Sequence, residues 1–430
     1  MGSAFILTEY HSFPGYNALY PVLGTALIIY ASTGFVNKFL SLQPMVFTGN
    51  ISYSLYLWHW PILVFARYTS IDFTLINQII FIALTYILSV LSWKYIEQPF
   101  RYFKLSSFKN ITIKLYVIPS IFIFSLLLIG FYFDGYQNRF SPSILTMDSA
   151  LHSSTSESRE HCHSPYRNSE ALPNKKCIFG ENSEHKTQAN VLIFGDSHAN
   201  HMVPFIRALT EDAHVSGQDY TLDRCLPILD LKWGSTIHLA EKCKNRNKLT
   251  ANYIQKNNFD FVVMAASWPG ITTRRIFEED RLEDNDRIEK LLKSKLIETL
   301  QIIVDSGAIP VMIADTPTLA GKSPKCPIKK ELFNTKLNCD IFHHSNKLFN
   351  ELIGSLSNEF PQLVTIRPQL LMCDAENCKM DLNGVPLYRD EDHLNKIGSK
   401  LLGYIFLEST RNPFDLGSIT TKDHYSQQLL

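Results

Sequence analysis

The chain has 430 residues, which is enough for two or three domains. It carries 41 basic and 41 acidic residues, so its formal net charge is zero and it lacks the basic surplus of a nucleic-acid-binding protein. The mean hydropathy of −0.04 conceals a division, because roughly the first 135 residues are strongly apolar and the remainder has the composition of a water-soluble domain.

Four apolar segments in the first part of the chain are each long enough to cross a hydrocarbon core of ~30 Å. They are residues 16–35, 46–67, 76–96 and 113–134. Residues 1–15 lack the charge pattern of a signal peptide. The third connection is basic, with Lys94, Arg101, Lys104, Lys109 and Lys114 in or beside it. Because basic loops stay in the cytoplasm, the chain after residue 135 is predicted to lie outside the inner membrane.

The segment 136–188 is polar and aperiodic, which predicts an extracytoplasmic linker or extension. All eight cysteines follow the apolar part, which favours disulfides in an oxidising compartment. Pairing of neighbours predicts Cys162–Cys177, Cys225–Cys243, Cys326–Cys339 and Cys373–Cys378, although eight cysteines allow many connectivities. Zinc is the alternative, for which Cys162 between His161 and His163 is a weak hint, since the sequence has no Cys-x-x-Cys pair.

Residues 189–430 alternate short apolar runs with amphipathic segments. The predicted strands are 191–194, 260–266, 310–314 and 363–366, and the clearest predicted helices are 285–305 and about 343–357. Such alternation predicts an α/β domain whose parallel sheet has helices on both faces. In sheets of this kind, ligands bind at the carboxyl ends of the strands.

A candidate nucleophile follows the first of these strands. Gly195, Asp196 and Ser197 break the apolar run, and helical spacing of apolar residues begins at Met202. Ser197 is therefore predicted to start a helix at the carboxyl edge of the sheet, where helix N–H groups stabilise developing negative charge. Its neighbours Asp196 and His198 are expected to hydrogen-bond the backbone around the turn.

A candidate base lies far downstream, just before a final apolar helix. Asp390 and His393 are three residues apart and can meet within one turn. His393 is predicted to take the proton of Ser197, and Asp390 to orient the imidazole and stabilise its charged form. Asp392 competes as the orienting carboxylate, but the side chain of a directly adjacent residue is expected to diverge from that of His393.

Gly195-Asp196-Ser197-His198 and Asp390-x-x-His393, in this order, resemble the motifs of the SGNH hydrolase/acyltransferase superfamily. The resemblance implies a flavodoxin-like, three-layer α/β domain. It also implies an oxyanion hole made by the N–H of the nucleophile, here Ser197, a glycine N–H, and an asparagine. Gly217 is a poor match for the glycine. The asparagine block is replaced by Ala-Ala-Ser-Trp at 265–268, which resembles the variant in SGNH domains fused to acyltransferase-3 proteins. Ser267 becomes a candidate donor, and Trp268 either a sugar-stacking platform or a packing residue.

Residues 49–61 and 95–101 resemble late segments of the acyltransferase-3 family of membrane proteins, and Phe13-Pro14-Gly15 and 21–24 fit the same register. The resemblance implies transfer of acyl groups, usually acetyl, from cytoplasmic acyl-CoA to extracytoplasmic sugars. The early helices of that family, with a histidine and an arginine-rich motif on the acyl-CoA side, have no counterpart here. The chain is therefore expected to be a late-starting reading frame, one product of a split gene, or a degraded copy.

The expected organisation is α-helical transmembrane segments followed by an α/β SGNH domain: a partial acyltransferase-3 membrane domain at 1–135, a periplasmic linker at 136–188, and the SGNH domain at 189–430. The preferred function is a bacterial inner-membrane O-acyltransferase, which uses Ser197 to acylate an envelope polysaccharide such as lipopolysaccharide O-antigen. A membrane-anchored carbohydrate esterase, and a truncated subunit that depends on a partner chain for the missing helices, are the alternatives. No bound metal or nucleotide cofactor is indicated, and acyl-CoA, usually acetyl-CoA, is the expected ultimate donor.

Overall fold

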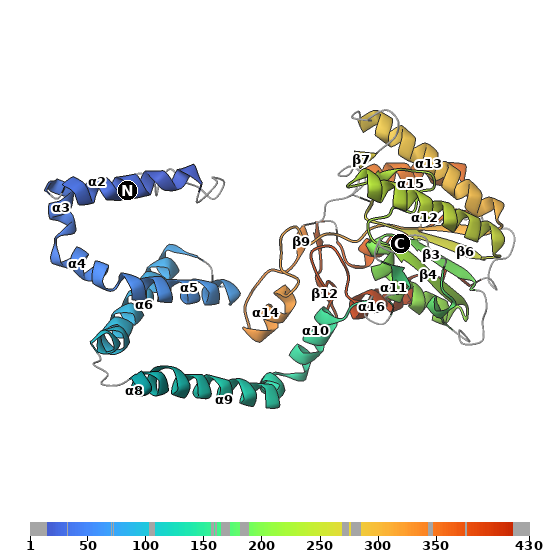
Figure 1. The fold of residues 1–430 in the computed structure, drawn as a ribbon. Coiled ribbons are helices and arrows are strands. Elements are labelled where there is room, and N and C mark those ends of the chain that lie inside the picture. Colours follow the sequence, from blue (N-terminus) through green and yellow to red (C-terminus); the bar gives the residue numbers. More distant parts are fainter. Residues whose placement is uncertain are drawn as a thin grey trace. The chain divides into compact units, whose positions relative to one another are not determined.

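The computed structural model describes residues 15–31, 33–69, 71, 73–102, 108–155, 159, 161–164, 173–180, 189–268, 275–276, 285–342, 347–374 and 376–415. Phe13, Pro14 and Lys104, and a large share of the predicted linker, lie outside these residues. The chain divides into two compact units, Met1–Gly135 and Tyr136–Leu430, which are shown in Figure 1 and described in turn.

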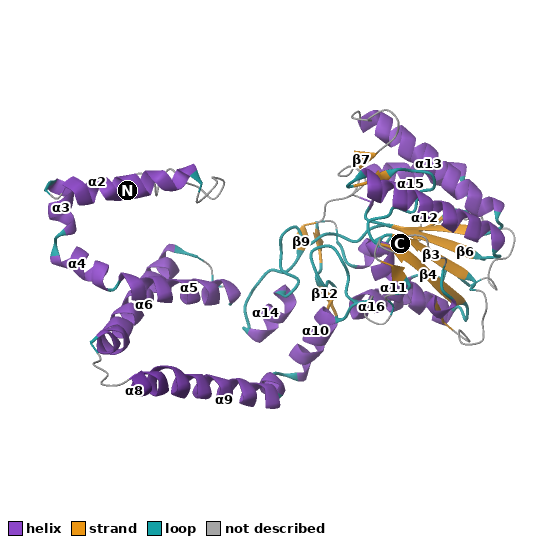
Figure 2. Ribbon diagram, viewed as in Figure 1, coloured by secondary structure: helices purple, strands orange, loops and turns teal. Residues whose placement is uncertain are grey.

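The first unit is helical in its described part (Figure 2). Its α-helices are α2 Leu19–Ala31, α3 Phe35–Leu40, α4 Gln43–Asn50, α5 Ser52–Tyr68, α6 Leu75–Ser92, α7 Gln98–Arg101, α8 Phe108–Thr112 and α9 Ile118–Tyr132. The π-helical turn Trp93–Glu97 joins α6 to α7, and a second at Ile113–Val117 joins α8 to α9. Among the described residues, two continuous helices, Leu75–Arg101 and Ile113–Tyr132, are long and apolar enough to cross a membrane.

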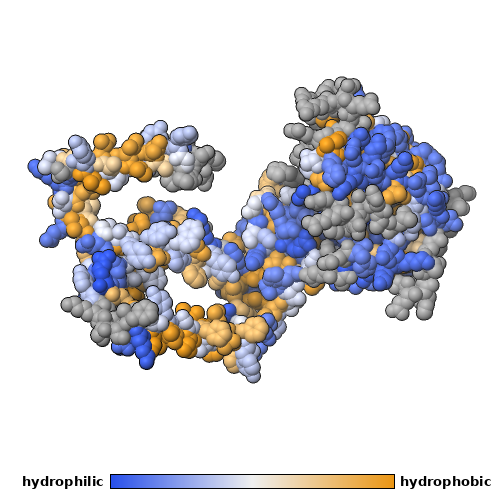
Figure 3. Space-filling model, viewed as in Figure 1, coloured by the Kyte–Doolittle hydropathy of each residue, from blue (hydrophilic) through white to orange (hydrophobic). Residues whose placement is uncertain are grey.

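The predicted segments 76–96 and 113–134 correspond to these two helices. The predicted segment 46–67 is divided at Ile51 between α4 and α5, and 16–35 contains a shorter apolar helix. Apolar side chains gather on the surface of α2 and α9 (Figure 3); Phe122 and Leu127 on α9, for example, are 64% and 66% exposed. Apolar surface of this extent is typical of membrane or protein interaction sites.

The second unit is built on a mixed, mainly parallel sheet, in which the described residues form seven strands. They are β1 His163–Ser164, β2 Ile178–Gly180, β3 Val191–Gly195, β4 Ser216–Leu222, β6 Phe261–Ala265, β8 Ile309–Ile313 and β10 Val364–Ile366. The central order is β4-β3-β6-β8-β10, all parallel, and β1 (parallel) and β2 (antiparallel) pair with the outer edge of β4. The four predicted strands are confirmed as β3, β6, β8 and β10, and β4 was not predicted.

The strand order changes direction between β3 and β6. From β3 the chain passes first to β4 on one side and later to β6 on the other, so that Gly195 at the end of β3 lies between Thr221 and Ala265. A parallel sheet opens a crevice at such a point, outside the carboxyl ends of its strands. Ser197, two residues after β3 ends, lies at this position.

Helices cover both faces of the sheet (Figure 1). One face carries α12 Ile237–Lys256, α13 Asn285–Asp305 and α15 Lys347–Glu359, and the other carries α11 Ser197–Asp212 and α16 Lys396–Ser409. Leu192 and Phe194 of β3 point into the first core, whereas Val191 and Ile193 point into the second. This alternation buries both faces of the strand and gives the three-layer arrangement.

The remaining elements lie around this framework. They are α10 Pro142–His152, α14 Cys326–Leu332, and the short strands β5 Trp233–Gly234, β7 Arg275–Ile276, β9 Ile341–Phe342, β11 Asn377–Cys378, β12 Asp381–Leu382 and β13 Val385–Pro386. The predicted helix 285–305 is α13, and the predicted helix 343–357 is α15, whose first four predicted residues lie outside the described residues.

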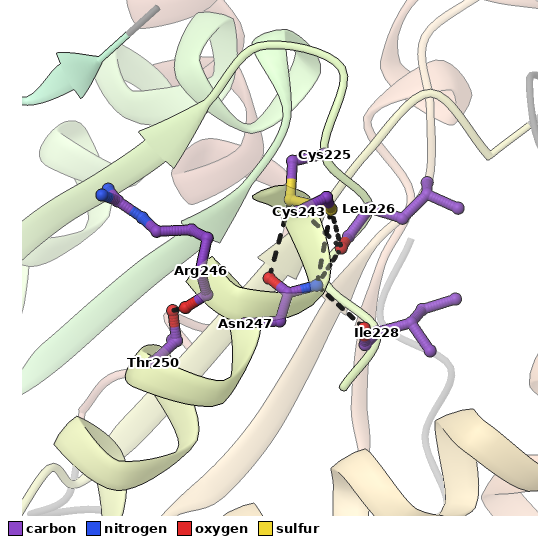
Figure 4. The surroundings of a disulfide bond; sticks show 7 residues. All are labelled: Cys225, Leu226, Ile228, Cys243, Arg246, Asn247 and Thr250. Atoms are coloured by element: carbon purple, nitrogen blue, oxygen red, sulfur yellow. Dashed lines mark hydrogen bonds between the residues drawn. A yellow bond between two sulfur atoms is a disulfide. The ribbon is translucent and has the colours of Figure 1, made fainter. Parts of the chain in front are cut away.

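All eight cysteines form the four disulfides predicted from sequence proximity. Because Cys162 is bonded to Cys177, its sulfur is not available as a thiolate, and the alternative zinc site there does not form. The Cys225–Cys243 bond ties the loop after β4 to α12 (Figure 4). Asn247, one turn further along α12, donates to the carbonyl oxygens of Leu226 at 2.7 Å and Ile228 at 2.8 Å. The loop that follows β4 at the carboxyl edge is thus held covalently and by two hydrogen bonds.

Candidate active site

The turn that carries Ser197 requires a glycine at its start. Gly195 has φ +149°, and a Cβ at this position would lie 1.9 Å from the carbonyl oxygen of Ala265 and 2.8 Å from Cβ of Ala199. A side chain therefore cannot fit between β3, β6 and α11. This close passage places the first residue of α11 directly at the edge of the sheet.

Asp196 joins this turn to the loop after β6. It is the N-cap of α11: one carboxylate oxygen accepts from the N–H of His198 at 2.8 Å, and the other accepts from the N–H of Ser267 at 3.0 Å. Burial raises the pKa of Asp196. The prediction that Asp196 bonds the backbone is confirmed.

The predicted base, His393, is carried by a tight hairpin at residues 388–394. Tyr388 and Leu394 form a backbone bridge, and the N–H of Arg389 donates to the carbonyl of His393 at 2.9 Å. The next residue, Asn395, is the N-cap of α16 and accepts from the N–H of Gly398 at 2.7 Å. His393 is therefore held just before a capped helix.

Close packing of α16 against α11 brings the two parts of the site together. A Cβ on Gly403 of α16 would lie 2.8 Å from both Cβ of Ala208 and the carbonyl oxygen of Phe205 on α11. The hydroxyl of Ser399 accepts from the N–H of Phe205 at 3.2 Å. Small residues on α16 thus allow the two helices to lie in direct contact.

The predicted nucleophile, base and orienting carboxylate lie in hydrogen-bond contact. Ser197 Oγ lies 2.9 Å from His393 Nε2, and His393 Nδ1 lies 2.9 Å from Asp390 Oδ1. The same Asp390 oxygen accepts from the backbone N–H groups of Asp392 and His393. The arrangement can activate an alcohol for attack on a carbonyl carbon, with the N-terminal turn of α11 beside the charge that develops.

Asp392 also reaches the base, so the prediction that its side chain diverges from His393 is wrong. Asp392 Oδ1 lies 2.9 Å from His393 Nδ1. The two backbone bonds to Asp390 curl the turn, so that the carboxylates at 390 and 392 face the same ring nitrogen. Although burial favours the neutral ring, these two carboxylates raise the pKa of His393 to about 9.

The prediction that His198 hydrogen-bonds the backbone around the turn is wrong for its ring, which contacts two carboxylates instead. Its Nδ1 lies 2.7 Å from Asp315 Oδ1, and its Nε2 lies 3.7 Å from Asp392 Oδ2. Asp315 follows β8 at the carboxyl edge of the sheet. The sequence carries a signal for Asp315, which directly follows the predicted strand 310–314. Asp315 is nevertheless not among the predicted site residues.

Two further predicted site residues lie elsewhere. Gly217 pairs with Val191 at the amino end of β3, whereas the site adjoins Gly195 at its carboxyl end. A Cβ on Gly217 would lie 2.5 Å from the ring of Phe179, so this glycine makes room for an aromatic ring and is no oxyanion donor. Four residues of strand, ~13 Å, separate Gly217 from the edge of the sheet that carries Ser197.

Trp268 is a packing residue. Its side chain is only 1% exposed, its Nε1 donates to the carbonyl of Ile313 at 2.8 Å, and its ring lies against Phe349. A sugar cannot stack on a ring without an open face, so the substrate-binding prediction is wrong. Ser267 does lie at the edge of the site, but its backbone N–H is taken by Asp196, which leaves its hydroxyl as the candidate donor.

Three groups of side chains within the described residues have atoms close enough for a metal ion: His161 with the disulfide-bonded Cys162 and Cys177, His198 with His201 and Asp315, and His198 with Asp392 and His393. The last two groups contain His198, whose Nδ1 is hydrogen-bonded to Asp315. This hydrogen bond and the ion pairs account for the short distances among His198, Asp315, Asp392 and His393 without an ion.

Known proteins resemble parts of this chain. The family model described as "SGNH domain (fused to AT3 domains)" matches residues 161–408. The O-acetyltransferase OatA of Staphylococcus aureus strain MRSA252 is 36% identical over 113 residues, which cover 23% of this chain and 19% of OatA. The putative O-acetyltransferase SACOL0978 of S. aureus strain COL is 38% identical over 78 residues, or 18% of this chain and 13% of that protein.

The chain thus matches no more than about a fifth of the length of these curated relatives. Among solved structures, the periplasmic domain of a lipopolysaccharide acetyltransferase from Salmonella ser. Paratyphi A aligns with 52% of this chain and 83% of its own, at 17% identity and a TM-score of 0.39. Because the family model spans more than half of the chain, and Ser197, Asp390 and His393 all lie inside the matched range, this protein belongs to the family of SGNH domains fused to AT3 domains.

Proposed function

We propose that the protein is a membrane-anchored O-acyltransferase, which transfers an acetyl group through Ser197 to a cell-envelope polysaccharide such as lipopolysaccharide O-antigen. The observation that carries the proposal is the contact of Ser197 Oγ with His393 Nε2, backed at His393 Nδ1 by Asp390. The relatives named O-acetyltransferase support the acyl group and the transfer to oxygen.

In the proposed reaction, Ser197 Oγ attacks the acyl carbonyl as its proton passes to His393 Nε2. The imidazolium then protonates the leaving group, and Ser197 carries the acyl group as an ester. A sugar hydroxyl next gives its proton to His393 and attacks this ester, which returns Ser197 to its free form. The N–H of Ser197, in the first turn of α11, and the hydroxyl of Ser267 are the proposed donors to the oxyanion in both steps.

The proposed location is the bacterial inner membrane, crossed several times, with the SGNH domain in the periplasm. The two candidate membrane helices and the four disulfides support this orientation. Acyl-CoA, usually acetyl-CoA, is the proposed ultimate donor, and a partner chain with further acyltransferase-3 helices is proposed to bring the acyl group across the membrane.

The test uses the full chain in lipid nanodiscs, with 4-nitrophenyl acetate as donor and purified O-antigen as acceptor. Transfer predicts acetylated O-antigen by mass spectrometry and an acetyl-Ser197 peptide after rapid quench, both absent from Ser197→Ala. Release of acetate without acetylated glycan, at a rate that the glycan leaves unchanged, would assign the site to a carbohydrate esterase instead. Glycan acetylation that persists in Ser197→Ala would refute the proposal.

A further inference from the structure

A second histidine–aspartate pair lies directly behind the site. His198 is 4% exposed, its Nδ1 is 2.7 Å from Asp315 Oδ1, and the same Asp315 oxygen accepts from the N–H of Thr316 at 2.9 Å. Asp315 is therefore fixed by its own loop, and it fixes the ring of His198 in turn. The reaction proposed above gives neither residue a role.

The other edge of His198 faces the base. Its Nε2 lies 3.7 Å from Asp392 Oδ2, and the second oxygen of Asp392 lies 2.9 Å from His393 Nδ1. The rings of His198 and His393 are 4.9 Å apart between centroids. Asp315, His198, Asp392, His393 and Ser197 thus form one continuous chain, in which acidic and basic groups alternate up to the nucleophile.

We propose that His198 is a positioning residue, which is anchored by Asp315 and holds Asp392 beside His393, so that two carboxylates orient the base. Within the part of the chain that the structure describes, Asp392 pairs with His198 and His393, while Asp390 takes the backbone N–H groups of this turn and the guanidinium of Arg389. Without His198, only His393 among these described residues would hold Asp392. The inference rests on the proposed function only in assigning His393 as the base.

The charge of His198 has a predictable effect on His393. The titratable and charged groups that face His198 are Asp196 at the N-cap of α11, His201 on α11, Asp315 after β8, and Asp392 and His393 before α16. Although burial favours the neutral ring, Asp315 and Asp392 hold the pKa of His198 well above its ordinary value. His198 is thus a cation close to His393, and it lowers the pKa of that ring.

His201 cannot take over this function. Burial, followed by the charges of His198 and His393, holds the pKa of His201 well below its ordinary value, so His201 is neutral. Its ring packs on His198 at 5.0 Å and on His393 at 5.8 Å, which fixes both rings from a third side.

The first test compares His198→Gln with the unaltered full chain by pH profiles of acetyl-ester turnover. Glutamine keeps a donor toward Asp392 but removes the charge. Two unit charges 4.9 Å apart interact by the equivalent of ~0.6 to ~2.5 pH units for effective dielectric constants between ~80 and ~20. The acid limb of kcat/KM in His198→Gln is therefore expected to move to higher pH by an amount in this range.

His198→Ala, alone and combined with Asp392→Asn, tests whether His198 acts through Asp392. Because alanine removes the donor as well as the charge, His198→Ala is expected to lower kcat on the order of tenfold in the wild-type background, and less than about twofold once Asp392 is already replaced by asparagine. Equal losses in both backgrounds, or an acid limb that stays in place or moves to lower pH, would overturn the proposal. One bound zinc ion per chain that is lost in His198→Gln would also overturn the proposal, because His198 and Asp315 would then be metal ligands.

Gly217→Ala is the control for general loosening of the fold. Gly217 pairs with Val191 at the amino end of β3, and a Cβ there would lie 2.5 Å from the ring of Phe179, so this variant disturbs the core at the end of the strand opposite to the site. A comparable loss of thermal stability with an unchanged acid limb is expected. If the control moves the acid limb as far as His198→Gln does, the effect comes from general loosening of the fold and the proposal fails.

A measurement that does not depend on catalysis distinguishes failure of this inference from failure of the proposed function. Histidine ¹⁵N NMR of the full chain should show a His198 signal, identified by its loss in His198→Gln, that stays protonated at pH 7. The His393 signal should titrate at higher pH in that variant. Should the chain acetylate no glycan while this coupling is present, the proposed function is wrong and the inference stands. Should the chain acetylate glycan while the coupling is absent, the inference is wrong and the function stands.

Discussion

Replacing Asp390 by asparagine should lower the activity only moderately, because Asp392 also orients His393. In a site with a single orienting carboxylate, the same replacement has a larger effect. The asparagine side chain keeps an oxygen for the backbone N–H groups of Asp392 and His393, so the turn is preserved. The pKa of His393 stands at about 9 against an ordinary 6.5, a difference equivalent to about 3 kcal/mol in favour of the imidazolium.

Asp390 and Asp392 each lie 2.9 Å from His393 Nδ1 and raise its pKa against burial and the charge of His198, so each contributes no less than about half of this net stabilisation. Removal of one charge then costs on the order of 2 kcal/mol, or roughly 10–30-fold in kcat, compared with ~10⁴-fold when a lone orienting aspartate is replaced. The double variant Asp390→Asn/Asp392→Asn has no carboxylate at Nδ1 and should lose on the order of 10³-fold or more.

The assay is acetyl-ester turnover by the full chain in nanodiscs, with Ser197→Ala as the background rate and thermal melting as the control for folding. A loss of ~10⁴-fold in Asp390→Asn alone would show that Asp392 does not support the base. An unchanged rate in Asp390→Asn, together with a large loss in Asp392→Asn, would assign the orienting role to Asp392 and refute the equal division.

Three further outcomes follow from the structure. The base is active only when neutral, so kcat/KM should rise about tenfold per pH unit from pH 6 to 8 and level off near the pKa of His393, about 9; a plateau already at pH 7 would contradict this. Gly217→Ala would place a Cβ 2.5 Å from the ring of Phe179 and should lower the free energy of unfolding by ~1–3 kcal/mol in a urea titration, while kcat changes little because the site is at the other end of the strand. Replacing Cys225 and Cys243 by alanine opens a loop with a sequence separation of 18 and should lower the midpoint of the same titration by the equivalent of ~3 kcal/mol; equal midpoints would show that the loop after β4 needs no covalent link.

Sequence patterns predicted the parts of the fold that carry a strong local signal. The runs that became β3, β6, β8 and β10 are apolar throughout because both faces of each strand are covered by helices. The strand β4 is also buried, but with Gln218, Asp219 and Thr221 inside, so it has no apolar run and was not predicted.

For the site, two short motifs and their order were enough to name Ser197, Asp390 and His393. A serine after a strand that ends in glycine, and an aspartate three residues before a histidine at a helix start, are local arrangements that the chain specifies by itself. Asp392 was misjudged because adjacent side chains diverge in a regular backbone, whereas here two backbone bonds to Asp390 curl the turn.

Contacts between distant segments were decided only by the tertiary structure. The pairing of His198 with Asp315 joins residues 117 positions apart, and it depends on β8 lying two strands from β3 in the sheet. The burial of Trp268 depends on α15 covering that face, and the distance of Gly217 from the site depends on the register of β4. A residue type and its neighbours in sequence specify which chemistry is available, but strand order, register and helix packing determine which of those groups meet.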